Sequence, residues 1–202
     1  MELLGVLLLY FIYGLLTLLL MFVGRRVARR LGKPPQWGSR PVWVASLLFV
    51  FWDTVPTLAT HKYLCVTDYG FREFKSLAQW KAENPGVPET LVPIEKNDFE
   101  KRGNVEIRHL NARFDWQHEM KRILLSVRRS RERLLDTKTG EVLGEYVDYF
   151  AGAGPLGSGR DIEVLDLKLW LYRPGCHPAG SKSELRPFSD LWNNAKRIGE
   201  SL

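Results

Sequence analysis

The first apolar stretch of the chain lacks the flanking residues of a cleaved signal peptide. Residues 3–23 carry no charge, and ten of these 21 residues are leucine. A secretory signal would have positive charge before this run and a small-residue cleavage site after it. Here Met1 and Glu2 precede the run and Arg25 and Arg26 follow it, so the flanks are reversed. Because about 20 apolar residues cross the hydrocarbon core as a helix, we interpret residues 3–23 as a retained transmembrane helix.

Acidic residues are absent from the segment that follows, residues 24–40. Its six basic residues are Arg25, Arg26, Arg29, Arg30, Lys33 and Arg40. Short loops that are rich in Lys and Arg stay on the cytoplasmic side of a membrane. We therefore expect this loop to be cytoplasmic, and both the N-terminus and the chain after a second span to lie on the opposite side.

A second apolar run, residues 41–60, contains a single acid and is long enough to cross a bilayer once. Pro41 suits the first turn of a helix, and Pro56 would kink its outer half. A short re-entrant or interfacial segment is the alternative interpretation. Together the two runs predict a two-helix transmembrane hairpin over residues 1–60.

The single acid of the second run is Asp53, and a carboxylate within a span is costly unless it is paired or hydrated. On the first run, Tyr10, Tyr13, Gly14 and Thr17 are spaced at three and four residues and so share one helix face. If the spans pack antiparallel, Tyr10 lies at the depth of Asp53. We therefore predict a hydrogen bond from Tyr10 or Tyr13 to Asp53. The alternatives are a hydrated carboxylate at the outer interface and a basic partner on another subunit.

The rest of the chain has no large excess of positive charge. The whole chain has a formal net charge of +6, but residues 61–202 carry 23 basic and 21 acidic side chains. The basicity is therefore mainly a topology signal, and we expect no nucleic-acid partner. The roughly 140 residues after the second run are enough for one compact core.

Hydrophobic periodicity in residues 61–202 predicts a mixed α+β domain with an antiparallel sheet. Helices are expected over residues 77–83, with Ser76 as the N-cap, and over residues 97–102 and 188–198. Two alternating apolar runs, residues 105–109 and 112–116 with a slip between them, predict strand, and residues 161–172 predict a further strand. Residues 121–135 and 141–150 are interpreted as an antiparallel hairpin joined by a turn at residues 136–140. A helix over residues 120–135 is the rival interpretation.

Complete catalytic motifs are also missing. The four histidines, His61, His109, His118 and His177, lie in neither a nucleophile elbow nor a helical zinc-protease motif. A hydrolase needs a nucleophile, a base and an orienting group, and no sequence motif of this chain contains these three groups together. We therefore predict no catalytic residue and no cofactor. Catalysis by residues scattered along the chain stays open as an alternative.

Only two cysteines are present, Cys65 and Cys176, and each has a histidine nearby, His61 and His177. One interpretation is a structural disulfide, and the other is a metal site formed by the two cysteines and the two histidines. Export to an oxidising compartment favours the disulfide. Unlinked thiols are the third possibility.

A basic run lies within the first strand of the expected hairpin. Under that interpretation Arg129, Arg131 and Arg133 share one strand face. Such a run is usually a solvated face paired with acids, here Glu132, Glu141 and Glu145. The functional alternative is contact with lipid headgroups or with an acidic partner.

These features predict a protein of the bacterial inner membrane with a periplasmic domain, residues 61–202. The expected partners are the lipid bilayer and other membrane or envelope proteins. We expect a non-catalytic binding or scaffold subunit of a membrane complex. The alternatives are an extracytoplasmic enzyme that acts on envelope material, and a small-molecule or metal sensor.

Overall fold

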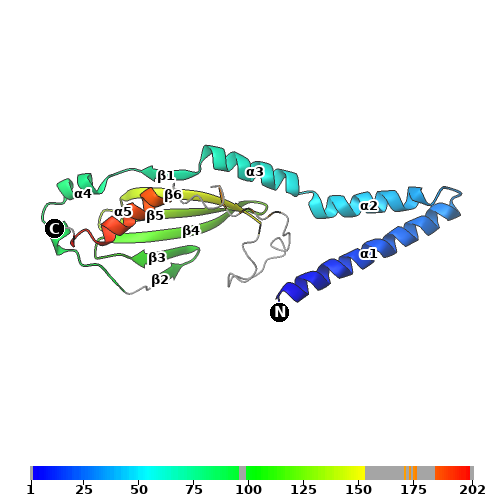
Figure 1. The fold of residues 1–202 in the computed structure, drawn as a ribbon, viewed down its shortest axis with the longest axis horizontal. Helices are drawn as coiled ribbons and strands as arrows, with labels where there is room; N and C mark the ends of the chain where they lie inside the picture. The colour runs from blue at the N-terminus through cyan, green and yellow to red at the C-terminus, as the bar shows by residue number, and fades with distance from the viewer. Residues whose placement is uncertain are drawn as a thin grey trace.

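The computed structural model describes residues 2–95, 99–152, 171, 173, 175–176 and 185–200. Within these residues the chain is α+β: a long apolar helix is followed by further helices and then by a six-stranded antiparallel sheet (Figure 1). The strand expected over residues 161–172, apart from Leu171, and the histidine His177 fall outside the described residues.

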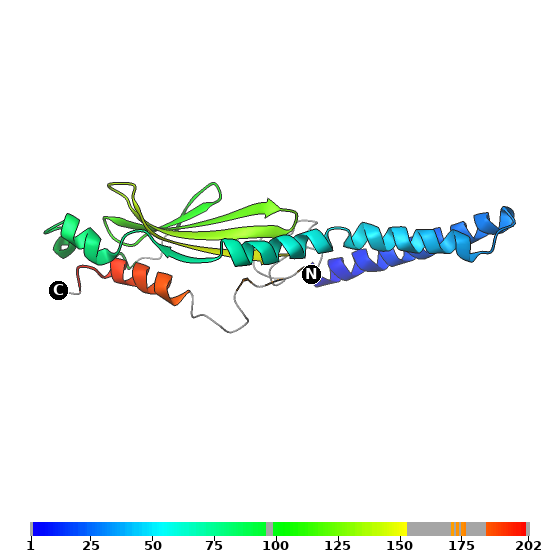
Figure 2. The ribbon, with the colours of Figure 1, turned by 90° about the horizontal axis from the view of Figure 1, so that it is seen from above.

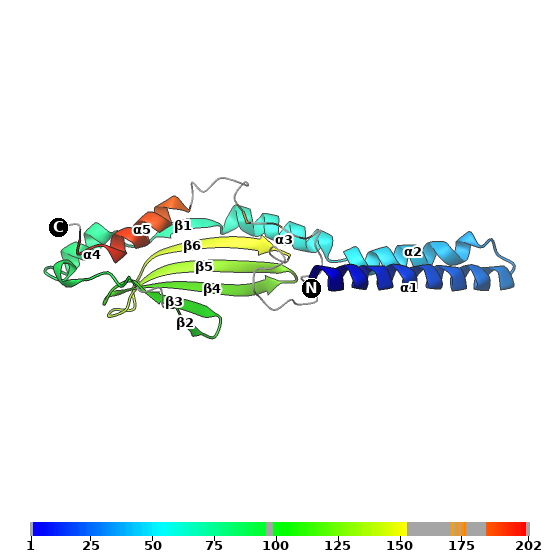
Figure 3. The ribbon, with the colours of Figure 1, turned by 60° about the horizontal axis from the view of Figure 1, so that its bottom comes forward.

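The N-terminal part consists of two apolar helices that lie side by side, α1 (Glu2–Arg30) and α2 (Gln36–Phe51) (Figures 1 and 3). Leu8, Phe11 and Phe49 are 57%, 64% and 74% exposed. Residues 7–30 and residues 36–67 are each long and apolar enough to cross a membrane. Apolar surface of this extent needs an apolar environment or a partner to cover it.

Two glycines allow α1 and α2 to approach closely. A Cβ atom on Gly38 would lie 1.9 Å from the carbonyl oxygen of Gly24, and one on Gly24 would lie 2.4 Å from the carbonyl oxygen of Gly38. Backbones approach this closely in membrane helix pairs where small residues stand at the contact. Near the other end of the pair, the Tyr13 hydroxyl donates to the carbonyl oxygen of Ser46 at 2.8 Å.

The second apolar run is divided between two helices. The α2 helix ends at Phe51, and α3 (Thr54–Thr67) begins after Trp52 and Asp53. The break therefore precedes Pro56, which lies in the first turn of α3, where its missing N–H leaves no helical hydrogen bond unmade. Pro41 does not begin a helix as expected, because α2 already starts five residues earlier. The domain boundary expected between residues 60 and 61 falls within α3.

The sheet contains six strands in the order β1-β6-β5-β4-β3-β2, and all neighbours are antiparallel (Figure 3). The strands are β1 (Gly70–Glu73), β2 (Phe99–Arg102), β3 (Val105–His109), β4 (Phe114–Leu124), β5 (Val127–Asp136) and β6 (Val142–Ala151). The turn expected at residues 136–140 joins β5 to β6, with Gly140 in the left-handed region at φ 73°.

Two predictions about the strands were wrong. Residues 99–102 form β2 rather than part of a helix, because they pair with β3. Residues 121–135 are neither one strand nor a helix, because the chain reverses at Leu125 and Ser126 between β4 and β5. The reversal contains no Gly, Pro or Asn, and Leu125 itself adopts a positive φ of 49°. Alternating apolar residues continue across this turn, so the sequence gives no sign of it.

Helices cover one face of the sheet and close its main core. The expected helix over residues 77–83 is α4 (Leu77–Glu83), with Ser76 as its N-cap, and a short 3-10 helix, η1 (Pro88–Thr90), follows. The C-terminal helix α5 (Arg186–Lys196) starts two residues earlier than expected and lies along one side of the sheet (Figure 2). The core between them is formed mainly by Trp80, Leu110, Phe114, Leu134, Leu143, Tyr146, Phe188 and Leu191.

A buried ion pair lies within this core. Arg113 Nη2 is 2.5 Å from Asp136 Oδ2, and Trp80 Nε1 donates to the same carboxylate at 2.7 Å. Burial by itself would raise the pKa of Asp136, but the hydrogen bonds from Arg113 and Trp80 outweigh it and lower the pKa. The charged carboxylate therefore joins α4 to the ends of β4 and β5.

Candidate functional site

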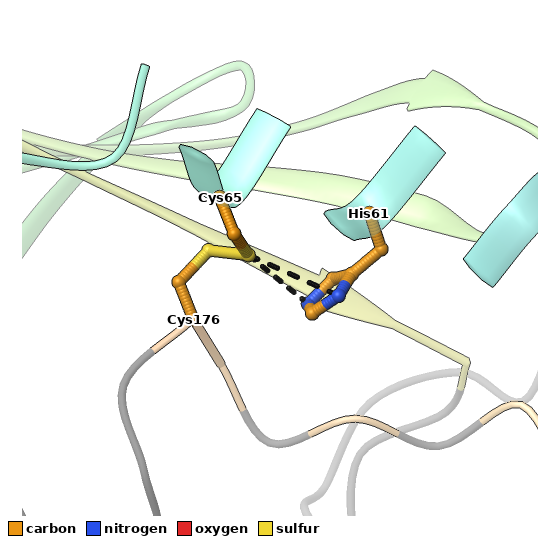
Figure 4. Close-up of side chains that lie close together, drawn as sticks. All are labelled: His61, Cys65 and Cys176. Carbon is orange, nitrogen blue, oxygen red and sulfur yellow. Dashed lines mark hydrogen bonds between the residues drawn. A yellow bond between two sulfur atoms is a disulfide. The ribbon is translucent and has the colours of Figure 1, made fainter. Parts of the chain in front are cut away.

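The α3 helix is joined to the chain after β6 by a disulfide. Cys65 on α3 is bonded to Cys176, with 5.2 Å between the two Cα atoms and 111 positions between the residues in sequence (Figure 4). Both cysteines pack against a small apolar cluster of β5 and β6, formed by Val127, Val147 and Tyr149. The structure thus contains the disulfide that the sequence favoured.

His61 lies one helical turn before Cys65 and faces the same contact (Figure 4). Its Nε2 atom is 3.0 Å from the carbonyl oxygen of Tyr149, and a carbonyl can only accept, so Nε2 carries the proton and donates it. Cys65 Sγ lies 3.6 Å from the same Nε2 atom and 3.8 Å from Nδ1. The hydrogen bond to the Tyr149 carbonyl fixes the orientation of the ring.

His61, Cys65 and Cys176 are also the residues to consider for the alternative interpretation, a metal site. The ligand atoms of His61, Cys65 and Cys176 lie within 4.8 Å of one another. Zinc binds thiolates, and sulfurs joined in a disulfide offer none. This arrangement therefore provides a metal site only after reduction, and the fourth candidate ligand, His177, lies outside the described residues.

A second polar contact joins α3 to β6 one turn further on. The Tyr149 hydroxyl donates a hydrogen bond to Asp68 Oδ2, and Arg72 Nη2 lies 2.6 Å from Oδ1 of the same carboxylate. The hydrogen bond from Tyr149, followed by the one from Arg72, lowers the pKa of Asp68. Burial, together with the hydrogen bond to Asp68, raises the pKa of Tyr149 to about 12. Both shifts favour a neutral phenol beside an ionised carboxylate.

A row of aromatic and polar side chains extends the α5 face of the sheet toward β3. Trp116 and His118 on β4 lie opposite Leu134 and Glu132 on β5, and their rings are stacked at 5.7 Å between centroids. Trp116 Nε1 donates to Glu132 Oε2 at 2.9 Å. Burial raises the pKa of Glu132, although the Trp116 hydrogen bond opposes the change. We refer to Trp116, His118, Ser130 and Glu132 as the sheet-face cluster.

The sheet-face cluster contains a nucleophile next to a base. His118 Nε2 lies 2.9 Å from Ser130 Oγ, and His118 Nδ1 lies 3.7 Å from Glu106 Oε2. The histidine-to-serine distance suits proton transfer, whereas 3.7 Å exceeds a hydrogen bond. Ser130 lies within β5, which pairs with β4 on one side and β6 on the other. The nearby backbone N–H groups therefore serve the sheet rather than a developing oxyanion.

The expected basic strand face is present on the opposite side of β5. Arg129, Arg131 and Arg133 occupy alternate positions, and each is partly buried. Arg129 Nη2 lies 3.6 Å from Glu119, and Arg131 Nε lies 2.9 Å from Glu145. Of the acids expected as partners, Glu145 is one, but Glu132 lies on the other face. Glu141 instead pairs with Lys75 at 2.6 Å.

The basic residues of the first loop lie close together at one end of the helix pair. Arg25, Arg26, Arg29 and Arg30 belong to the last two turns of α1, so helix continues further than the expected loop boundary at residue 24. Lys33 lies in the short connection, and Arg40 lies in the second turn of α2. All six therefore lie near the same turn between the two helices.

The polar face of α1 is directed at α2, as its spacing indicated. Tyr10, Tyr13, Gly14 and Thr17 line one wall of a groove between the helices, opposite Trp43 and Ser46 on α2 among others. Tyr13 gives its only hydroxyl proton to the carbonyl oxygen of Ser46, so it is not the donor to Asp53. Asp53 is fully buried at the α2–α3 break. A hydrogen bond from Tyr10 to Asp53 stays a prediction.

Comparisons with known proteins identify no relative. No family model, curated protein or solved structure matches the chain. The functional argument therefore rests on the residues described above.

Proposed function

We propose that this protein is a membrane-anchored binding or scaffold subunit of an envelope membrane complex. Under this proposal residues 3–23 of α1 and residues 41–60, which run through α2 into the first half of α3, form a transmembrane hairpin. The sheet domain lies on the extracytoplasmic side, in the bacterial periplasm. The exposed apolar surface of both helices supports the anchoring. The basic residues near the α1–α2 turn support the orientation, and the disulfide is consistent with an oxidising compartment.

The junction between α3 and the sheet is the observation that carries the proposal. The α3 helix follows directly on the apolar helix α2 and is fixed to β6 by the disulfide, by His61 and by Asp68. These contacts lie on successive turns, so they oppose both rotation and sliding of the helix. A domain that recognises another membrane protein benefits from presenting its surface at a fixed height and orientation, which this junction provides.

The part of the sheet furthest from α3 offers the surface that we assign to binding. Phe99 on the edge strand β2 is 50% exposed, and the Arg108 guanidinium lies 4.5 Å from the centre of its ring. Trp116 packs edge-on against the same ring at 6.3 Å between centroids. Aromatic and arginine side chains are enriched at the centres of protein interfaces.

Photo-crosslinking in intact membranes tests this assignment. A photoreactive phenylalanine analogue in place of Phe99 is expected to give a discrete adduct with a second protein. The same analogue in place of Val92, which is 74% exposed but lies away from this surface, is the matched control. Equal adduct patterns at the two positions, or no adduct at Phe99, would argue against a binding surface on β2.

A second candidate function, hydrolysis of envelope material, is favoured by the contact between His118 and Ser130. Incubation of the purified full chain with a fluorophosphonate probe distinguishes it from the first. The binding proposal expects no labelling of Ser130, whereas labelling that disappears in both Ser130→Ala and His118→Ala variants would establish a nucleophilic serine.

A further inference from the structure

The β4–β5 turn carries an apolar and basic tip that the proposed function leaves unexplained. Ile123 and Leu124 are 41% and 49% exposed, and the adjoining Lys121 and Arg122 are also exposed. Residues 121–125 include no acid. Leu125 keeps a large aliphatic side chain at a positive φ of 49°, a conformation that glycine or asparagine would adopt at lower cost.

This tip is directed toward the same end of the domain as the apolar helices. Figures 1 and 3 both show the β4–β5 turn at the end of the sheet from which the helix pair of α1 and α2 extends. The opposite end of the sheet is closed by α4 and the end of α5 in both views. Of all the exposed apolar residues of the sheet, those of the tip therefore lie nearest to the helix pair.

The hydrogen bond between His61 and Tyr149 allows the heights of tip and helix to be compared. Tyr149 lies opposite Arg129 in the ladder, and Ser126 in the β4–β5 turn is three residues before Arg129. Strands rise about 3.3 Å per residue, so the turn lies about 10 Å beyond His61. A helix rises about 1.5 Å per residue, so the same height on α3 is reached about seven residues before His61, at Thr54.

That height lies beside the break between α2 and α3, in the outer part of the second apolar run. The residue before Asp53 is Trp52, which is 59% exposed at the C-terminal end of α2, and tryptophan is enriched where helices cross the membrane–water interface. A tip at this level, with aliphatic side chains at its end and basic side chains beside them, fits the headgroup layer of a bilayer that contains acidic lipids.

We propose that the β4–β5 tip docks into the outer headgroup layer of the membrane that the two apolar runs span, with Ile123 and Leu124 entering the interface and Lys121 contacting acidic phospholipid headgroups. The inference rests on the proposed membrane anchoring. The sheet domain then has two attachments to the bilayer, one through α3 beside β6 and one through the tip between β4 and β5. The aromatic surface of β2 and β3 stays directed away from the lipid and available to a protein.

Site-specific fluorescence in nanodiscs tests the docking. Both native cysteines are in the disulfide, so a single added cysteine is the only free thiol in the oxidised chain. An environment-sensitive dye is attached to Leu124→Cys, to Val92→Cys as an exposed control at the far end, and to Phe49→Cys as a control on α2. Lipids with a spin label on the headgroup serve as the shallow quencher, and lipids labelled deep in the acyl chain serve as the deep quencher.

Docking is expected to shift the emission of the dye at position 124 to shorter wavelength and to raise its quenching by headgroup labels at least twofold over position 92. The difference should be larger in nanodiscs with acidic phospholipid than in purely zwitterionic ones, and a Lys121→Glu change should reduce it. Equal quenching at positions 124 and 92, with deep quenching at position 49, would overturn the docking while leaving the anchoring intact.

Two other outcomes also overturn the inference. A dye at position 49 that no lipid label quenches would contradict the membrane anchoring itself, and the docking with it. A dye at position 124 that shifts in native membranes but not in nanodiscs of any lipid composition would assign the tip to a protein partner instead.

Discussion

His61 Nε2 donates to the carbonyl oxygen of Tyr149 at 3.0 Å, and this bond places a turn of α3 against a defined position of β6. Because β1 pairs with β6 only over residues 144–147, the carbonyl of Tyr149 lies beyond the reach of β1. The α3 helix thus supplies the partner that the ladder lacks there. The disulfide one turn later closes the same contact covalently.

The first prediction concerns this disulfide. On a non-reducing gel the oxidised chain should migrate faster than the reduced chain, because the bond closes a loop of 111 residues. Cys65→Ser and Cys176→Ser should each abolish the shift and lower the free energy of unfolding by about 2–5 kcal/mol. Equal migration of the oxidised and reduced unaltered chains would contradict the bond, and a shift that persists in either variant would assign the shift to another cause.

The second prediction concerns orientation in the membrane. Reporter fusions within residues 25–40 should report the cytoplasm, and a fusion after Leu202 should report the extracytoplasmic side, because basic residues near the α1–α2 turn resist translocation. Replacing Arg25, Arg26, Arg29 and Arg30 together with glutamine should produce a mixed orientation. A cytoplasmic signal from the fusion after Leu202 in the unaltered chain would contradict the proposed location.

The sequence predicted the local elements well where capping or turn residues mark their ends. Ser76 and Gln79 form a reciprocal capping box at the start of α4, and the Asp136–Gly140 turn ends at a glycine with a positive φ. The apolar runs also became helices. These signals depend on neighbouring residues only, so one sequence is enough to read them.

The sheet-face cluster could not be predicted for a related reason. Its members are brought together by the register of β4 against β5, which places His118 opposite Glu132. Register follows from where the chain turns, and Leu125 and Ser126 give no turn signal. With the turn misplaced, residues 121–135 read as one strand, and His118 had no cross-strand partner. The full burial of Asp53 could not be predicted from the sequence either, because it depends on tertiary packing.

The third prediction concerns the buried ion pair of the core. Asp136 accepts from Arg113 and from the Trp80 indole, and its side chain is fully buried. An Asp136→Asn change leaves the Arg113 charge buried without its counter-charge, and such changes cost about 3–5 kcal/mol. Thermal unfolding followed by circular dichroism should show a large fall in the midpoint. The exposed Asp190→Asn on α5 is the control and should leave the midpoint nearly unchanged.

The fourth prediction concerns alkaline pH. The pKa of Tyr149 is raised to about 12 in the folded chain from an ordinary value of 10.0. A raised pKa means that the folded state favours the neutral phenol, so its contribution to stability is complete below pH 10 and is lost as the pH rises toward 12. That contribution is at most about 2.7 kcal/mol, since one pKa unit corresponds to about 1.36 kcal/mol.

A Tyr149→Phe variant should therefore lose less stability than the unaltered chain between pH 10 and pH 12, as measured by thermal unfolding in detergent. Tyr63→Phe, at a position that is 66% exposed on α3, is the control and should follow the unaltered chain. Parallel curves for Tyr149→Phe and the unaltered chain would show that the hydrogen bond to Asp68 does not hold Tyr149 neutral.

The last prediction concerns the contact between α1 and α2 and uses two glycines with opposite surroundings. A Cβ on Gly38 would lie 1.9 Å from the carbonyl oxygen of Gly24, whereas a Cβ on Gly14 would meet nothing within 4 Å. Alanine is a better helix former than glycine by about 1 kcal/mol, so helix propensity alone expects both substitutions to stabilise. Overpacking costs about 1–3 kcal/mol, and at Gly38 the obstacle is backbone that cannot rotate away. Gly38→Ala should therefore lower the thermal midpoint in detergent, and Gly14→Ala should leave it unchanged or raise it. If both variants stabilise the protein equally, α1 and α2 do not make this contact.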